Sequence, residues 1–116
     1  DLLGQFAGAL SAFQEDVKRI GAQDRVMVMA FSEFGRRVEQ NASGGTDHGT
    51  AGPLFLAGPM KNPGLHGKYP SLTELDGGDL KHTVDFRSVY AELLEKWLRV
   101  DPAGVVPERT KKLGIV

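Results

Sequence analysis

The stretch that decides the predicted fold class is RVMVMAFSEFGRR, residues 25–37. Residues 26–31 form an unbroken apolar run that ends abruptly at Ser32–Glu33. A strand that is covered on both faces has this pattern, and such strands belong to parallel sheets. The run therefore predicts an α/β fold in which helices flank a mostly parallel sheet.

A helix is predicted before this run. Apolar residues from Leu3 to Ile20 recur at spacings of 3, 4, 3, 4 and 3, which is one helical stripe, and Gly21 is a plausible stop. The stripe could be a coiled-coil seam. Because it covers fewer than three heptads, we favour a helix packed on a sheet.

A second helix is predicted to begin after Asp85, a good N-cap residue, and to carry an apolar face over residues 86–98. Glu92 and Lys96 are expected to form an i,i+4 ion pair on its other side. Short strands are predicted at residues 53–58 and 80–84.

Composition bounds the function classes. The 116 residues carry a formal net charge of −1 and no cysteine. This excludes disulfides, thiolate metal sites and a cysteine nucleophile, and offers no electrostatic case for nucleic acid or a membrane surface. No apolar run approaches the roughly 20 residues of a membrane span. We predict a single domain over residues 1–116.

The glycine-rich stretch GGTDHGTAG, residues 44–52, places Asp47 beside His48 in a predicted loop. Sites in open α/β sheets lie beyond the carboxyl ends of strands, so this loop is expected to approach Glu33. Two carboxylates and an imidazole would make a divalent metal site. Alternatively, Asp47 caps a turn through its own side chain and His48 is simply exposed.

Other polar residues give weaker predictions. Arg36 and Arg37 could grip an anion bidentately, or be solvated or ion-paired. Lys68 could stabilise a leaving group. His66 is expected in a surface loop, and His82 is expected to be structural.

Three motifs resemble those of a known family: SEFGR (32–36), GGTDHGTAGP (44–53) and DFRSVYAELLEKWL followed by VDP. Over residues 25–106 the chain resembles the C-terminal part of a bacterial, sulfatase-like family of unknown function in the alkaline phosphatase–sulfatase superfamily. The resemblance implies an alkaline-phosphatase-like α/β sandwich in which Asp47 and His48 are metal ligands. In a rival registration, Glu33 and Phe34 stand at the ligand positions and His48 faces the substrate. We favour ligation by Asp47 and His48, with Glu33 as a further ligand.

The resemblance further implies a metal-dependent hydrolase of phosphate or sulfate esters, with His48 and Arg36 as catalytic residues and zinc, manganese or calcium as the metal. The substrate would be a small-molecule or glycan ester, and the location periplasmic or secreted. No nucleophile motif is visible, so the chain is expected to be the C-terminal fragment of a larger domain and to be active only with the missing N-terminal part. Alternatives are non-catalytic binding of an anionic glycan or a protein partner, and a purely structural role.

Overall fold

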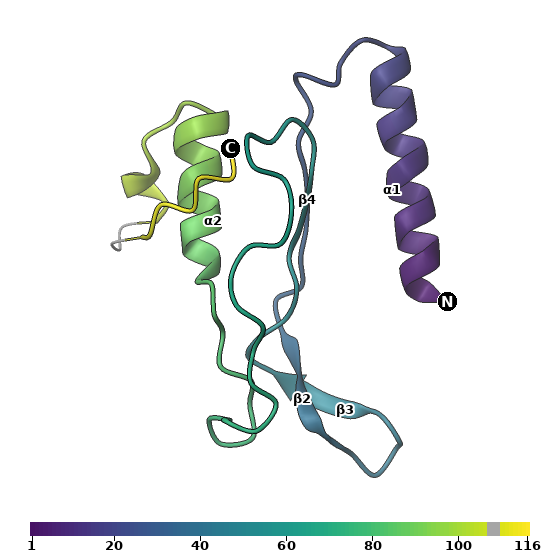
Figure 1. Cartoon of the computed structure of the whole chain (residues 1–116), viewed down its shortest axis with the longest axis vertical. Helices are drawn as coiled ribbons and strands as arrows, with labels where there is room; N and C mark the ends of the chain where they lie inside the picture. Colours follow the sequence, from purple (N-terminus) through teal and green to yellow (C-terminus); the bar gives the residue numbers. More distant parts are fainter. Residues whose placement is uncertain (107–109) are drawn as a thin grey trace. The chain divides into compact units, whose positions relative to one another are not determined.

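The computed structural model describes residues 1–106 and 110–116 (Figure 1). Contacts within the chain divide it into two compact units. The first unit comprises Asp1–Ala30 and Phe55–Met60, and the second Phe31–Leu54 and Lys61–Val116. That these belong to a single domain, itself part of a longer one, stays a prediction.

The first unit is built on the helix α1, Leu2–Arg19, and a two-stranded ribbon. The Asp1 side chain caps α1 by accepting from the Leu3 backbone N–H at 3.1 Å, and the helix ends just before Gly21, whose φ is +66°. The strands β1, Val28–Ala30, and β4, Phe55–Ala57, pair antiparallel. The predicted first helix and the predicted strand at residues 53–58 are therefore confirmed.

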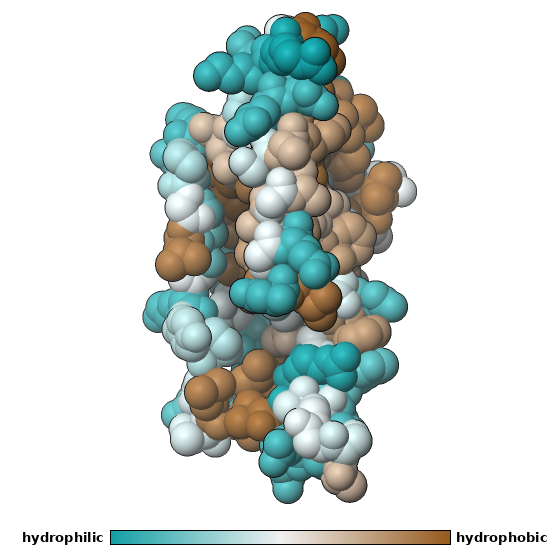
Figure 2. Space-filling view, turned by 90° about the vertical axis from the view of Figure 1, so that its right-hand side faces the viewer, coloured by the Kyte–Doolittle hydropathy of each residue, from teal (hydrophilic) through white to brown (hydrophobic). Residues whose placement is uncertain are grey.

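The apolar stripe of α1 is only partly covered within its unit. Phe6 packs on Phe55 of β4 with ring centroids 5.5 Å apart, and Val17 is buried. By contrast, Leu3 and Ile20 are each 69% exposed. Brown apolar side chains reach the surface in several places on the face drawn in Figure 2.

The predicted fold class is wrong. Each of the two sheets among residues 1–106 and 110–116 has two antiparallel strands, and none is a parallel sheet flanked by helices. The apolar run that suggested a strand covered on both faces contains only the three-residue β1, whose residues are half-buried, and Phe31 is 56% exposed. A short apolar run does not by itself distinguish a buried parallel strand from one strand of a small ribbon.

The second unit begins with a hairpin of β2, Gly35–Gln40, and β3, Thr46–Gly49. Asn41 closes its turn, because its side-chain carbonyl accepts the backbone N–H groups of Ser43 and Gly45 at 3.1 and 3.0 Å. Asp47 and His48, predicted in a loop, therefore lie in a strand. Glycine content suggested a loop, but the ladder with β2 satisfies the backbone groups of this segment.

The helix α2, Phe86–Glu92, follows in the same unit and continues as a π-helical segment, Leu93–Trp97. A short 3₁₀ turn, Pro102–Gly104, comes after it. The second predicted helix and its Asp85 cap are thus confirmed. Residues 80–84 contain no strand, and His82, expected there as a structural residue, is exposed.

The expected Glu92–Lys96 pair is also wrong. Lys96 Nζ donates to the adjacent Glu95 at 2.8 Å, while the Glu92 carboxylate accepts backbone N–H groups of residues 113–116. No helix in the described part of the chain combines the length and the apolar character needed to cross a membrane, in agreement with the prediction.

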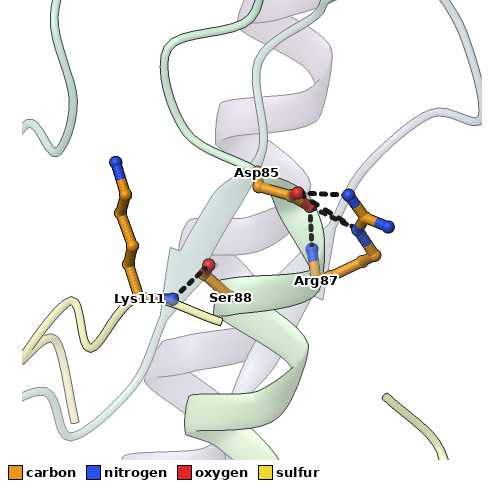
Figure 3. Close-up of polar contacts among 4 residues, drawn as sticks. All are labelled: Asp85, Arg87, Ser88 and Lys111. Carbon is orange, nitrogen blue, oxygen red and sulfur yellow. Dashed lines mark hydrogen bonds and ion pairs between the residues drawn. The ribbon is translucent and has the colours of Figure 1, made fainter. Parts of the chain in front are cut away.

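Asp85 holds the start of α2 through two kinds of contact (Figure 3). Its carboxylate accepts from the Arg87 backbone N–H at 2.9 Å and forms an ion pair with the Arg87 guanidinium at 2.6 Å. Chiefly because the Arg87 side chain donates to it, the pKa of Asp85 falls from 3.8 to about 2. The cap is therefore charged down to unusually acid pH.

Asp85→Ala is expected to destabilise the protein by roughly 1–2 kcal/mol, the usual loss for a removed N-cap. Asp85→Asn keeps a cap acceptor and is expected to cost less. Urea unfolding followed by circular dichroism measures both losses. The charge-dependent part of the contribution is complete above pH 3.8 and is lost as the pH falls through about 2. Equal stability of the alanine variant and the wild type at pH 7 would contradict this role.

Candidate functional site

The β2–β3 hairpin gathers three flat side chains on one side. Arg36 and His48 are directly opposite each other in the ladder, so their side chains share a face. The His48 ring stacks on Phe34, with centroids 3.7 Å apart and planes inclined by 13°. The Arg36 guanidinium carbon lies 5.5 Å from the centre of the Phe34 ring, within the range of a cation–π contact.

Arg36 is oriented without being neutralised. Its Nη1 donates to the Thr46 backbone carbonyl at 2.7 Å, which holds the guanidinium against the hairpin. It forms no ion pair with a carboxylate among residues 1–106 and 110–116. Because a guanidinium has five N–H donors, most of them are left for a ligand.

Arg37, the neighbouring residue, is committed to structure instead. Its Nε donates to the Asp79 carboxylate at 3.0 Å, which ties β2 to the turn at residues 76–79. From the sequence, both arginines had the same possible roles, but the structure gives them different partners. Arg37 is ion-paired, whereas Arg36 is the exposed cation of the hairpin.

Asp47 is held by the turn of its own hairpin. Its carboxylate accepts from Asn41 Nδ2 at 3.0 Å, in keeping with the alternative that it stabilises a turn. Successive side chains of a strand leave on opposite faces, so Asp47 and His48 start away from each other. An open hollow of about 540 Å³ is lined by Arg36, Arg37, Asn41, Thr46, Asp47 and His48.

The predicted metal ligands are not brought together. Glu33 is exposed in the segment before β2, where its carboxylate accepts from the Ser32 hydroxyl at 3.4 Å. His48 lies against Phe34, and Asp47 lies against Asn41. In the described part of the chain, no three His, Asp or Glu side chains are grouped so that they could hold an ion. The predicted metal site thus gains no support from the geometry and stays a prediction.

The remaining candidates lie elsewhere in the second unit. His66 is exposed in a loop, as predicted, with Nε2 2.8 Å from the Asn62 carbonyl oxygen. Lys68 is exposed, and its predicted role at a leaving group stays a prediction. Sequence reasoning missed Asn41 and Thr46. The signal for Asn41 was its position two residues before Ser-Gly-Gly, a combination typical of turns.

Comparison with known proteins gives a family assignment. The model of a family described as "Protein of unknown function (DUF1501)" matches residues 1–108. The chain belongs to the DUF1501 family. No curated protein matches the chain, and no solved structure matches it.

This result corrects the resemblance drawn from the sequence motifs. The chain matches the DUF1501 model over almost its whole length, and no sulfatase or alkaline phosphatase family is found. The motifs SEFGR and GGTDHGTAGP are therefore features of a DUF1501 chain. The sandwich fold and the metal-ligand roles that the resemblance implied lose that basis, and function has to be argued from the hairpin itself.

Proposed function

We propose that the β2–β3 hairpin of this protein binds an anionic group, as found in phosphate or sulfate esters and anionic glycans. The observation that carries the proposal is the state of Arg36, an exposed guanidinium that is oriented by the Thr46 carbonyl and has no carboxylate partner in the described part of the chain.

The chemistry of the neighbouring groups supports this choice. Arginine presents planar, paired donors that match the oxygens of phosphate or sulfate, and orientation in advance reduces the entropy lost on binding. The Phe34–His48 stack supports the guanidinium and adds a ring nitrogen of His48 to the same face. The adjoining hollow is open to solvent, so an anionic group of a larger molecule can reach the guanidinium.

Hydrolysis of such esters, with a divalent metal, is a second candidate that rests on one observation. Asp47 and His48 border the hollow that Arg36 also lines. Zinc or calcium needs at least three protein ligands, so further ligands would have to join them. Metal content and phosphatase and sulfatase activity of the full-length protein, compared with Asp47→Ala and His48→Ala, decide this candidate. Unchanged values in both variants exclude it.

Arg36→Ala is expected to weaken binding of inorganic phosphate, inorganic sulfate and a sulfated oligosaccharide by about tenfold or more, because a charged hydrogen-bonding partner is lost. NMR titrations of the wild type and the variant measure the change. Arg36→Lys should fall between them, because lysine keeps the charge but not the paired donors.

Arg19→Ala is the matched control. It removes the same charge from an exposed arginine that is paired with Asp16 in the other unit. Its affinities should equal those of the wild type. If Arg19→Ala and Arg36→Ala weaken binding equally, general charge attraction explains the binding and the proposed site is refuted.

A further inference from the structure

The carboxylate of Glu92 collects four consecutive backbone N–H groups of the segment 113–116. Oε2 accepts from Leu113 at 2.7 Å and Gly114 at 2.8 Å, and Oε1 accepts from Ile115 and, at 3.0 Å, from Val116. Glu92 is 8% exposed. A side chain near the end of α2 thus holds a stretch of main chain more than 20 residues further along the sequence.

Further hydrogen bonds hold the same segment on both sides. The Ser88 hydroxyl, one turn earlier on α2, accepts from the Lys111 backbone N–H at 3.1 Å (Figure 3). On the other side, the Ile115 carbonyl accepts the backbone N–H groups of Lys61 and Asn62 at 2.9 and 3.2 Å. Residues 111–116 therefore lie between α2 and the loop at residues 61–62, and we call them the latch.

The charge of Glu92 has an unusual source of stabilisation. Neither α2 nor the rest of the described chain supplies a cation that pairs with it. The charged residues on the surrounding segments are Arg87 on α2 (paired with Asp85), Glu95 and Lys96 on the helical extension, Lys111 and Lys112 on the latch, and Lys61 on the loop. Lys96 is engaged by Glu95, so the anion depends on the N–H dipoles of the latch.

Ionisation and latch closure are consequently coupled. Burial acts to raise the pKa of Glu92, but the four backbone N–H groups outweigh burial, and the pKa lies below its usual value of 4.5. A carboxyl group with a lowered pKa stabilises the closed state at higher pH. This contribution is lost as the pH falls through the lowered pKa.

We propose that residues 111–116 form a proton-sensitive latch that Glu92 keeps closed only while its carboxylate is ionised. A protonated carboxyl has an O–H donor where the latch presents N–H donors, so it cannot accept all four bonds. Opening frees the Ser88 hydroxyl and uncovers Ile115, which is 5% exposed in the closed state. The latch therefore changes the surface around α2 in response to acid.

Glu92→Gln imitates the protonated side chain at neutral pH. We expect the amide protection factors of residues 113–116, measured by hydrogen exchange at pH 7 and corrected for intrinsic rates, to fall by about tenfold or more, because bonds to a charged acceptor are lost. Glu95→Gln is the matched control, as it removes an exposed carboxylate from the same helical segment. It should leave these protection factors unchanged.

Unchanged protection in Glu92→Gln, or an equal loss in Glu95→Gln, overturns the proposal. If Glu92→Gln also loses protection in the β2–β3 hairpin, an acid titration of the wild-type chain decides. As the pH is lowered below 4.5, residues 113–116 should lose protection at a higher pH than the hairpin does, and this result supports the latch. Simultaneous loss in both regions refutes it.

Discussion

Gly35→Ala is expected to disrupt the β2–β3 hairpin and to abolish anion binding. A Cβ atom on Gly35 would lie 1.6 Å from the carbonyl oxygen of Ala51 and 2.1 Å from its carbonyl carbon. Both are backbone atoms, so no change of rotamer relieves the overlap. The chain after β3 would have to move away from β2, and we expect a loss of at least about 3 kcal/mol, in the range of severe overpacking.

Hydrogen exchange of the hairpin amides and phosphate titration measure the two consequences together. Gly45→Ala is the matched control, because a Cβ there would meet only Asn41 Oδ1 at an ordinary 3.8 Å. That variant should keep both the hairpin and the binding. A Gly35→Ala chain with native hairpin protection and native affinity would contradict the close approach of Ala51.

The helices of this fold could be predicted from the sequence because their signals are local. The 3-and-4 spacing of apolar residues in residues 3–20 and the aspartate at position 85 each act within a few residues, and α1 and α2 begin close to where they indicate. The pairing of strands depends on partners distant in sequence. β1 pairs with β4, and the paired residues Met29 and Leu56 are 27 positions apart in the sequence. Nothing in the apolar run indicated that its neighbour would be antiparallel.

The candidate site could be predicted in part for the same reason. Arg36, Asp47 and His48 stood out by residue type, and all three line the hollow beside the hairpin. The contacts around them could not be predicted, because the Phe34–His48 stack and the neighbouring Arg37–Asp79 ion pair depend on how the chain folds back on itself. Glycine at positions 44 and 45 suggested a loop, whereas it serves the turn of a hairpin.

Glu92 shows most clearly why local charge patterns mislead. An i,i+4 pair with Lys96 would contribute only about 0.3–0.5 kcal/mol on an exposed helix face. The charge-assisted bonds from the latch are worth considerably more, since even one hydrogen bond to a charged group contributes roughly 1.5–3 kcal/mol. The distant partner therefore outweighs the local one, and the sequence does not reveal it.

Gly58→Ala is expected to have a comparably large effect in the other unit. Gly58 directly follows β4 and has a φ of +148°, a backbone conformation that side chains disfavour. A Cβ there would lie 2.7 Å from the Val26 carbonyl oxygen and 3.1 Å from Met27 Cα. Strain and overlap together are expected to cost at least about 2–3 kcal/mol. The β1–β4 ribbon, which begins two residues after Val26, should lose its protection from hydrogen exchange.

Gly8→Ala separates this effect from a general sensitivity of the unit to added methyl groups. Gly8 lies within α1, and a Cβ there meets no atom within 4 Å. Alanine should therefore stabilise the helix by roughly 0.5–1 kcal/mol, because it restricts the unfolded chain and favours helical backbone. Thermal unfolding followed by circular dichroism should shift upward for Gly8→Ala and downward for Gly58→Ala. If both variants shift the unfolding temperature in the same direction, the close approach of Gly58 to Val26 and Met27 does not control the stability of the ribbon.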